Sequence, residues 1–168
     1  MITGITAVRS TRIQAQSQRE SERVAREHGQ QDKHKELRRA AYTELLQAVS
    51  ELNDCCMRIL SLTAHNHNNE LSDALSAARE TASALSRRTI VVTLEGPPSV
   101  AAKAGKCSTD GLAYFRAILD IYESSNAPPS DATIADLVGD RCDQQSATAN
   151  MSHAAFVRAA REVLGGHT

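Results

Sequence analysis

The clearest pattern in the chain is an apolar seam within residues 37–63. Six apolar side chains recur there at steps of three and four, the spacing that places residues on one face of an α-helix. They are Tyr42, Leu45, Val49, Leu52, Cys56 and Ile59. No glycine or proline interrupts the stretch. The pattern therefore predicts one long helix whose seam packs against the other helices of a bundle.

The same apolar spacing fails before this seam. Residues 11–36 are rich in the helix-favouring Gln, Glu, Arg and Ala, but extending the seam backwards meets an apolar side chain only at Val24. A helix that is polar on every side is held by side-chain ion pairs or by a partner. We expect a charged, partly flexible helical arm over residues 1–36, with a flexible start at 1–10, and a helical bundle over residues 37–168.

Three or more further helices follow from apolar spacing and from the residues that interrupt it. The Asn-rich run at 65–69 predicts a short connection and a second helix from Asn68 or Asn69 to about Leu94. The β-branched run at 89–93 is assigned to this helix, because a lone strand would have nothing to pair with. Gly96 and Pro97 stop it, and Pro98 suits the first turn of a third helix.

The third and last helices are less clearly bounded. The third should run to about residue 124, and its two glycines at 105 and 111 leave a break and a continuous helix equally open. After a break at 126–130 we expect a short helix around 134–138, a polar loop over 140–150, and a last helix that begins with an inward Met151. Gly165 and Gly166 should end it.

Together these patterns predict an all-α fold, an antiparallel bundle of about four helices with one long, projecting N-terminal helix. Composition agrees, because aromatic residues make up only 3% of the chain and large ring anchors are scarce. A chain of 168 residues can bury a sufficient core without metal or disulfides.

Charge is unevenly distributed between the arm and the rest of the chain. Residues 1–39 hold nine Lys or Arg against five Asp or Glu, and residues 40–168 hold ten against fifteen. A basic arm favours an anionic partner such as nucleic acid, although interleaved acids also fit a solvated face. Nucleic acid is therefore possible but less favoured. The candidate partner-binding residues are Arg12, Arg19, Arg23, Arg26, Lys33 and Lys35.

Motifs for catalysis and cofactor binding are missing from the sequence. The nearest approach to a metal site is Cys55, Cys56, His65 and His67, which lack the spacing of zinc ligands. No acidic residue precedes a histidine by three positions, which excludes the Glu-x-x-His pairs of di-metal bundles. Neither a phosphate loop nor a nucleophile elbow occurs. We expect no enzymatic activity and no cofactor.

The expected location is the cytoplasm. The four cysteines show no repeated short spacing and are read as reduced thiols. The first residues lack the basic and apolar segments of a secretion signal. No window approaches the roughly 18 consecutive apolar residues of a membrane span.

Four phrases in the chain resemble a loose set of uncharacterised all-helical actinobacterial proteins that carry a charged N-terminal helical arm. They are VAREHG (24–29), LRRAAYTELL (37–46), LEGPP (94–98) and FVRAAREVLG (156–165). The resemblance covers most of the chain. It implies a helical bundle with a projecting arm and lends no activity. Many of those proteins carry a membrane helix before the arm, and this sequence contains none.

These patterns favour a non-enzymatic helical interaction or scaffold protein. It would associate in a coiled-coil-like way with itself or with another helical protein, because a helix over residues 11–63 would span roughly 80 Å and the second helix only roughly 35 to 40 Å. The first alternative is binding of nucleic acid or an anionic surface through the basic arm. The second alternative is a metal-binding bundle.

The seam makes a stability prediction. Replacing Leu52 by Ala should lower the free energy of unfolding by about 2 to 5 kcal/mol, because it removes a core side chain and leaves a cavity. Urea denaturation measures this loss. A loss below about 1 kcal/mol would show that the register of the seam is wrong.

Overall fold

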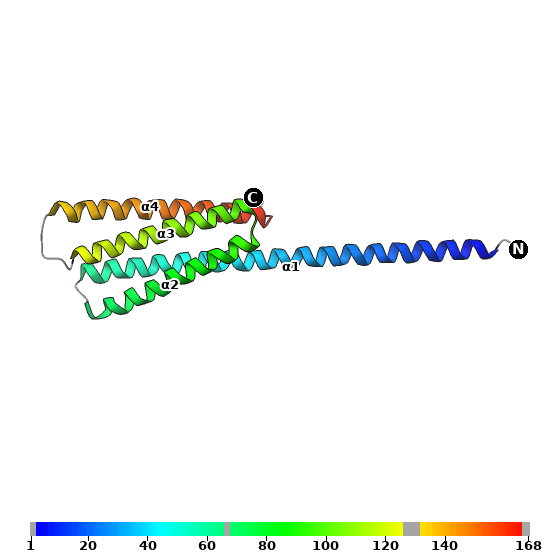
Figure 1. The fold of residues 1–168 in the computed structure, drawn as a ribbon, viewed down its shortest axis with the longest axis horizontal. Helices are drawn as coiled ribbons and strands as arrows, with labels where there is room; N and C mark the ends of the chain where they lie inside the picture. Colours follow the sequence, from blue (N-terminus) through cyan, green and yellow to red (C-terminus); the bar gives the residue numbers. More distant parts are fainter. Residues whose placement is uncertain (1–2, 66–67, 126–131, 166–168) are drawn as a thin grey trace. The chain divides into compact units, whose positions relative to one another are not determined.

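The protein is all-helical over the residues that the computed structural model describes, 3–65, 68–125 and 132–165. Side chains are described at 18–65, 69–123 and 139–165. Four helices fill these ranges, and none of the described residues forms a strand (Figure 1). The predicted all-α bundle is confirmed. The helices are α1 (Thr3–Ala64), α2 (Asn68–Glu95), α3 (Pro98–Ser125) and α4 (Ala132–Val163).

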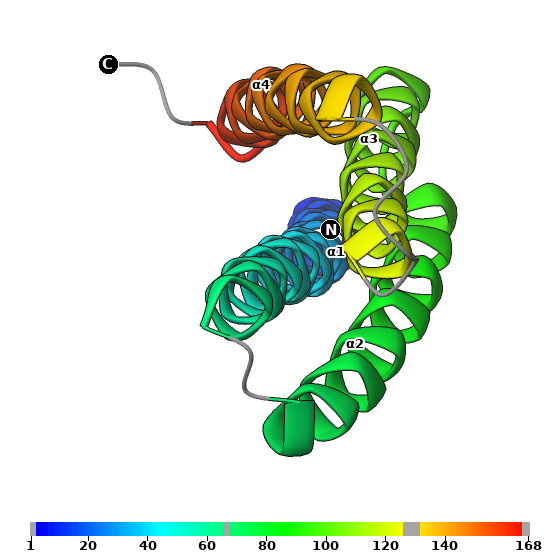
Figure 2. The ribbon, with the colours of Figure 1, turned by 90° about the vertical axis from the view of Figure 1, so that its left-hand side faces the viewer.

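The chain divides into two compact units, Met1–Leu37 and Arg38–Thr168. The second unit is the bundle. Within it, α2, α3 and α4 form an arc, and the part of α1 that begins at Arg38 lies on the inner side of that arc (Figure 2). α3 is the middle member of the arc and contacts both α2 and α4.

Polar contacts show that α1 and α2 run antiparallel. Arg58 of α1 pairs with Glu70 near the start of α2, with 3.9 Å between NH2 and Oε2. Arg38 lies much earlier in α1, and its Nε donates to the carbonyl of Glu95 at the end of α2, 2.8 Å away. The end of α1 therefore lies beside the start of α2, and an earlier part of α1 lies beside the end of α2. α1 ends at Ala64 and α2 begins at Asn68, so the two form the helical hairpin that the sequence predicts.

The α1 seam forms the centre of the core. Five of its six residues are at most 2% exposed, and Val49 is half-buried. The predicted register is therefore correct. Small side chains line the same core on every helix, which lets the helices approach closely. They include Ala41, Ala48, Ala74, Ala78, Ala104, Ala117 and Ala160.

α2 and α3 end and begin where the sequence predicts. The β-branched run at 89–93 is helical, with Val92 fully buried and Ile90 exposed. The N–H of Gly96 donates to the carbonyl of Val92 at 2.9 Å, and α3 begins at Pro98. α3 then runs unbroken through the segment between Gly105 and Gly111, which settles in favour of continuity the alternative that the sequence left open.

α4 corrects the prediction of a polar loop over 140–150. The segment is helical, and α4 is one helix instead of two short ones. Two apolar residues in the segment hold it on the bundle, because Cys142 is buried and Ala149, seven positions later, is half-buried. The side chain of Arg141 also pairs with Asp120 of α3 at 3.3 Å. Polar composition misled the prediction, since no glycine or proline stands between 140 and 150.

The inward position predicted for Met151 is also wrong. Met151 is 66% exposed, and its neighbour Ser152 is buried instead. The hydroxyl of Ser152 donates to the carbonyl of Ala149 at 3.0 Å, which satisfies the polar group inside the core. Phe156 is fully buried, and Gly165 adopts a left-handed φ of 85° just after α4 ends, where the sequence predicts the end of the last helix.

Some of the other predicted positions lie among the described residues, and others lie outside them. α1 begins at Thr3, so residues 3–10 are helical where a flexible start was expected. Ile134, Leu137 and Val138 lie in α4, and their side chains lie outside the described set. His67 lies outside the described residues altogether.

Tyr42 carries an unusual hydroxyl in the core. Its ring meets that of Phe156 edge to face, with 5.9 Å between ring centroids, and joins α1 to α4. The hydroxyl is buried without a hydrogen-bond partner among the described residues. It lies against Gly96, where an added Cβ would be 3.1 Å from the Tyr42 oxygen and 2.7 Å from the Val92 carbonyl oxygen. Burial raises the pKa of Tyr42.

Replacing Tyr42 by Phe should therefore leave stability unchanged or raise it by about 1 kcal/mol. The substitution keeps the ring contact and removes a polar atom that pays a desolvation cost without a hydrogen bond. Tyr42→Ala is the control and should lose about 3 to 5 kcal/mol. Thermal and urea unfolding measure both. A clear loss in Tyr42→Phe would mean that the hydroxyl has a partner.

Candidate functional site

The first unit presents an exposed polar helix. Every side chain described from Gln18 to Leu37 is exposed, including the apolar Val24 at 41% and Leu37 at 55%. This segment therefore buries no apolar seam of its own. The predicted partner-binding residues Arg19, Arg23, Arg26, Lys33 and Lys35 all lie here, and all are exposed.

Helical register gathers four of these basic residues on one face. Arg19, Arg26 and Lys33 are seven residues apart, and seven residues complete two helical turns to within about 20°. Arg23 lies three positions before Arg26, on the same face. We call this group, Arg19, Arg23, Arg26 and Lys33, the basic stripe. It spans about 21 Å along the helix.

The remaining predicted residues stand apart from the stripe. Lys35 follows Lys33 by two positions and so lies about 200° further round the helix, on the opposite face. Arg12 shares the seven-residue register of the stripe, but its side chain lies outside the described set. The sequence grouped all six residues by charge alone, and only the helical register separates Lys35 from the others.

Acidic residues flank the stripe without entering it. Arg26 pairs with Glu22 (3.9 Å between NH2 and Oε2), and Arg23 pairs with Glu27 (3.6 Å between Nε and Oε1). All four side chains are more than half exposed, so these pairs contribute little stability. Both pairs join residues four positions apart and support the helix itself.

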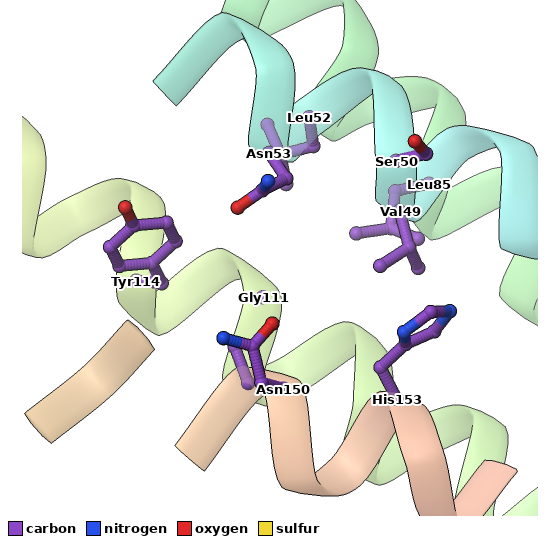
Figure 3. Close-up of a pocket in the computed structure, with 10 residues that line it drawn as sticks. Val49, Ser50, Leu52, Asn53, Leu85, Gly111, Tyr114, Asn150 and His153 are labelled. Atoms are coloured by element: carbon purple, nitrogen blue, oxygen red, sulfur yellow. The ribbon is translucent and has the colours of Figure 1, made fainter. Parts of the chain in front are cut away.

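A second candidate lies inside the bundle unit. A cleft of about 250 Å³ opens between α1, α3 and α4, with α2 contributing to its floor (Figure 3). Its lining residues come from all four helices. They are Val49, Ser50, Leu52, Asn53, Leu85, Gly111, Tyr114, Ala149, Asn150 and His153.

The cleft has an apolar floor and a polar rim. Val49, Leu52 and Leu85 form the floor. Asn53 of α1 and Asn150 of α4 reach toward the hollow from opposite sides, with His153 beside Val49 (Figure 3). The lining contains no Asp, Glu, Lys or Arg.

Sequence reasoning did not predict this cleft. Its residues are scattered over positions 49–153 and match no motif. The available signals were small. Gly111 stands in the interior of a helix, and Asn150 lies in a segment that was predicted to be a loop.

Among the described residues, the cysteines and His65 considered as metal ligands do not form a site. The four thiols are unpaired. Cys56 is buried in the seam, Cys55 lies 4.0 Å from the hydroxyl of Thr81, and His65 Nδ1 contacts the carbonyl of Ser61 at 2.7 Å. Within the described ranges, no three His, Cys, Asp or Glu side chains gather closely enough to hold a metal ion.

A search for membrane-spanning helices and comparisons with known proteins complete the description. Over the described part of the chain, no helix has the length and apolar character needed to cross a membrane. Comparison with protein-family models, with curated proteins and with solved structures finds no match to this chain.

The buried thiols predict a loss of stability at alkaline pH. Burial raises the pKa of Cys56 from 9.0 to about 12 and that of Cys107 from 9.0 to about 11. Above about pH 9 the unfolded chain releases these protons and the folded chain retains them. The unfolded state then binds fewer protons, so stability is complete below about pH 9 and falls as the pH rises toward 11 to 12.

Urea unfolding at pH 8 and pH 10.5 tests this expectation. Each thiol should account for a loss of up to about 2 kcal/mol at the higher pH. Cys56→Ala is the control, and its decline between the two pH values should be shallower than that of the wild type. Equal declines in both proteins would show that Cys56 ionises freely in the folded state.

Proposed function

We propose that the protein is a non-enzymatic helical interaction protein whose basic stripe binds an acidic helical protein partner. The observation that carries the proposal is the exposed basic stripe, in which Arg19, Arg26 and Lys33 are seven residues apart and Arg23 shares their face. An acidic helix with the same repeat can meet it along its length, as charged positions do beside a coiled-coil seam.

The partner must be met by the polar unit, because the apolar seam is already occupied. Tyr42, Leu52 and Ile59 are covered by the chain's own α2, α3 and α4. A coiled-coil-like association through that seam would require the bundle to open. The residues from Gln18 to Leu37, whose side chains are all exposed, are therefore the part of α1 that we assign to the partner.

Binding of nucleic acid or another anionic surface is the second candidate, and the same stripe supports it. A row of basic residues can neutralise phosphates. Glu22 and Glu27, which flank the stripe, favour a protein instead. A protein helix can offer basic residues to these acids, whereas a phosphate backbone would be repelled by them. The four unpaired thiols suit a reducing compartment, and we propose the cytoplasm as the location.

Two double variants of equal charge test the stripe. Arg19→Gln/Arg26→Gln removes two stripe charges, and the matched control Lys35→Gln/Arg39→Gln removes two exposed basic residues that do not belong to the stripe. The probes are a synthetic helical peptide with Glu at seven-residue spacing and a duplex DNA of about 20 base pairs. Binding is measured by fluorescence anisotropy at two salt concentrations.

We expect the peptide to bind, with affinity about fivefold to tenfold weaker for the stripe variant and nearly unchanged for the control. Equal effects of both variants would show that only net charge matters and would remove the proposal. Tighter binding to DNA than to the peptide at equal salt would establish the second candidate instead. Light scattering on the full chain shows whether the acidic partner is a second copy.

A further inference from the structure

The cleft in the bundle lies beside a half-buried position of the α1 seam. Val49 is the only member of the six-residue seam that is not fully buried, and it lines the cleft together with Leu52 and Leu85. The half-buried side chain of Val49 therefore leaves apolar surface open to the cleft. Covering it with an apolar group would be favourable.

Gly111 gives the cleft part of its volume. A glycine in the interior of α3 costs about 1 kcal/mol of helix stability relative to alanine. Close packing does not require it, because an added Cβ would meet only Leu85 Cδ2, at an ordinary contact distance of 3.7 Å. The space that the missing side chain leaves belongs to the cleft.

The rim determines which chemistry fits. The side chains of Asn53, Asn150 and His153 make no hydrogen bond to another residue that the structure describes, and the two amides reach toward the cleft from opposite walls (Figure 3). An amide both donates and accepts hydrogen bonds. Because no carboxylate, lysine or arginine lines the cleft, a buried charge on a ligand would lack a strong partner.

We propose that this cleft binds a small uncharged molecule with one aromatic ring and a hydrogen-bonding substituent, such as a phenol or an aromatic amide. Size supports the assignment, because a cavity of about 150 Å³ accepts benzene and this cleft of about 250 Å³ leaves room for a substituent. The ring lies on Val49 and Leu85, and the substituent bonds to the amides of Asn53 and Asn150. This site is separate from the basic stripe and goes beyond the proposed interaction function.

The test uses phenol and benzamide as probes on the full-length protein, with benzylammonium as a charged probe of similar size. Heteronuclear NMR follows the side-chain amides of Asn53 and Asn150 and the ring of His153. We expect saturable shifts centred on these groups, with dissociation constants on the order of 1 mM or lower for the neutral probes. The charged probe should bind about tenfold more weakly.

Two glycines of α3 provide a matched pair of variants. Gly111→Leu fills the cleft, and Gly105→Leu makes the same change where an added Cβ meets nothing within 4 Å. We expect at least about tenfold weaker probe binding in Gly111→Leu and no change in Gly105→Leu. Ala149→Leu narrows the cleft from α4 and should reproduce the loss if Gly111→Leu fails to fold.

Three outcomes would overturn the proposal. They are the absence of saturable shifts up to the solubility limit of the probes, shifts spread over the whole bundle, and equal binding by the cleft and control variants. Equal binding of the charged and neutral probes would contradict the assignment of an uncharged ligand.

Discussion

Enclosure of the α1 seam is the interaction on which the rest of the bundle depends. The seam places Leu45, Cys56 and Ile59 at zero exposure, and α2, α3 and α4 form an arc around it. Such an arc needs small residues where helices approach, because large side chains would hold the axes apart. The alanines on all four helices meet that need. With few aromatic residues, the core obtains its burial from closeness instead of from large rings.

The close packing buries a few polar groups, and these groups differ in whether they have a hydrogen-bond partner. Ser152 is buried, and its hydroxyl is bonded within α4 to the carbonyl of Ala149. Tyr42 is different, because its ring completes the contact with Phe156 and its hydroxyl stays unpaired at the turn near Gly96. The turn between α2 and α3 thus keeps a glycine because both a carbonyl and the Tyr42 hydroxyl occupy the space beside it.

The parts of the fold that could be predicted from the sequence were those that depend on the local spacing of apolar residues. The seam register, the extent of α2 and the start of α3 at Pro98 follow from spacing and from residues that stop helices. α4 was mispredicted because its middle is polar in composition. Burial of its residues Cys142 and Ser152 in the core holds this segment on the bundle as a helix, and such tertiary packing is not visible in the local sequence. The exposure of Met151 shows the same limit, since an apolar side chain alone does not fix which face is inward.

The two candidate sites differ in how far the sequence could reveal them. The basic residues of α1 were visible by charge, but acidic residues alternate with them along the chain. Only the helical register shows that four of the basic residues share one face. The cleft was invisible, because its walls come from four helices. One sequence feature does connect to it. The six seam positions were expected to pack against the other helices, and Val49 is only half-buried at the place where the small residues Gly111 and Ala149 line the cleft. Incomplete enclosure of the central helix is thus the physical origin of the cleft.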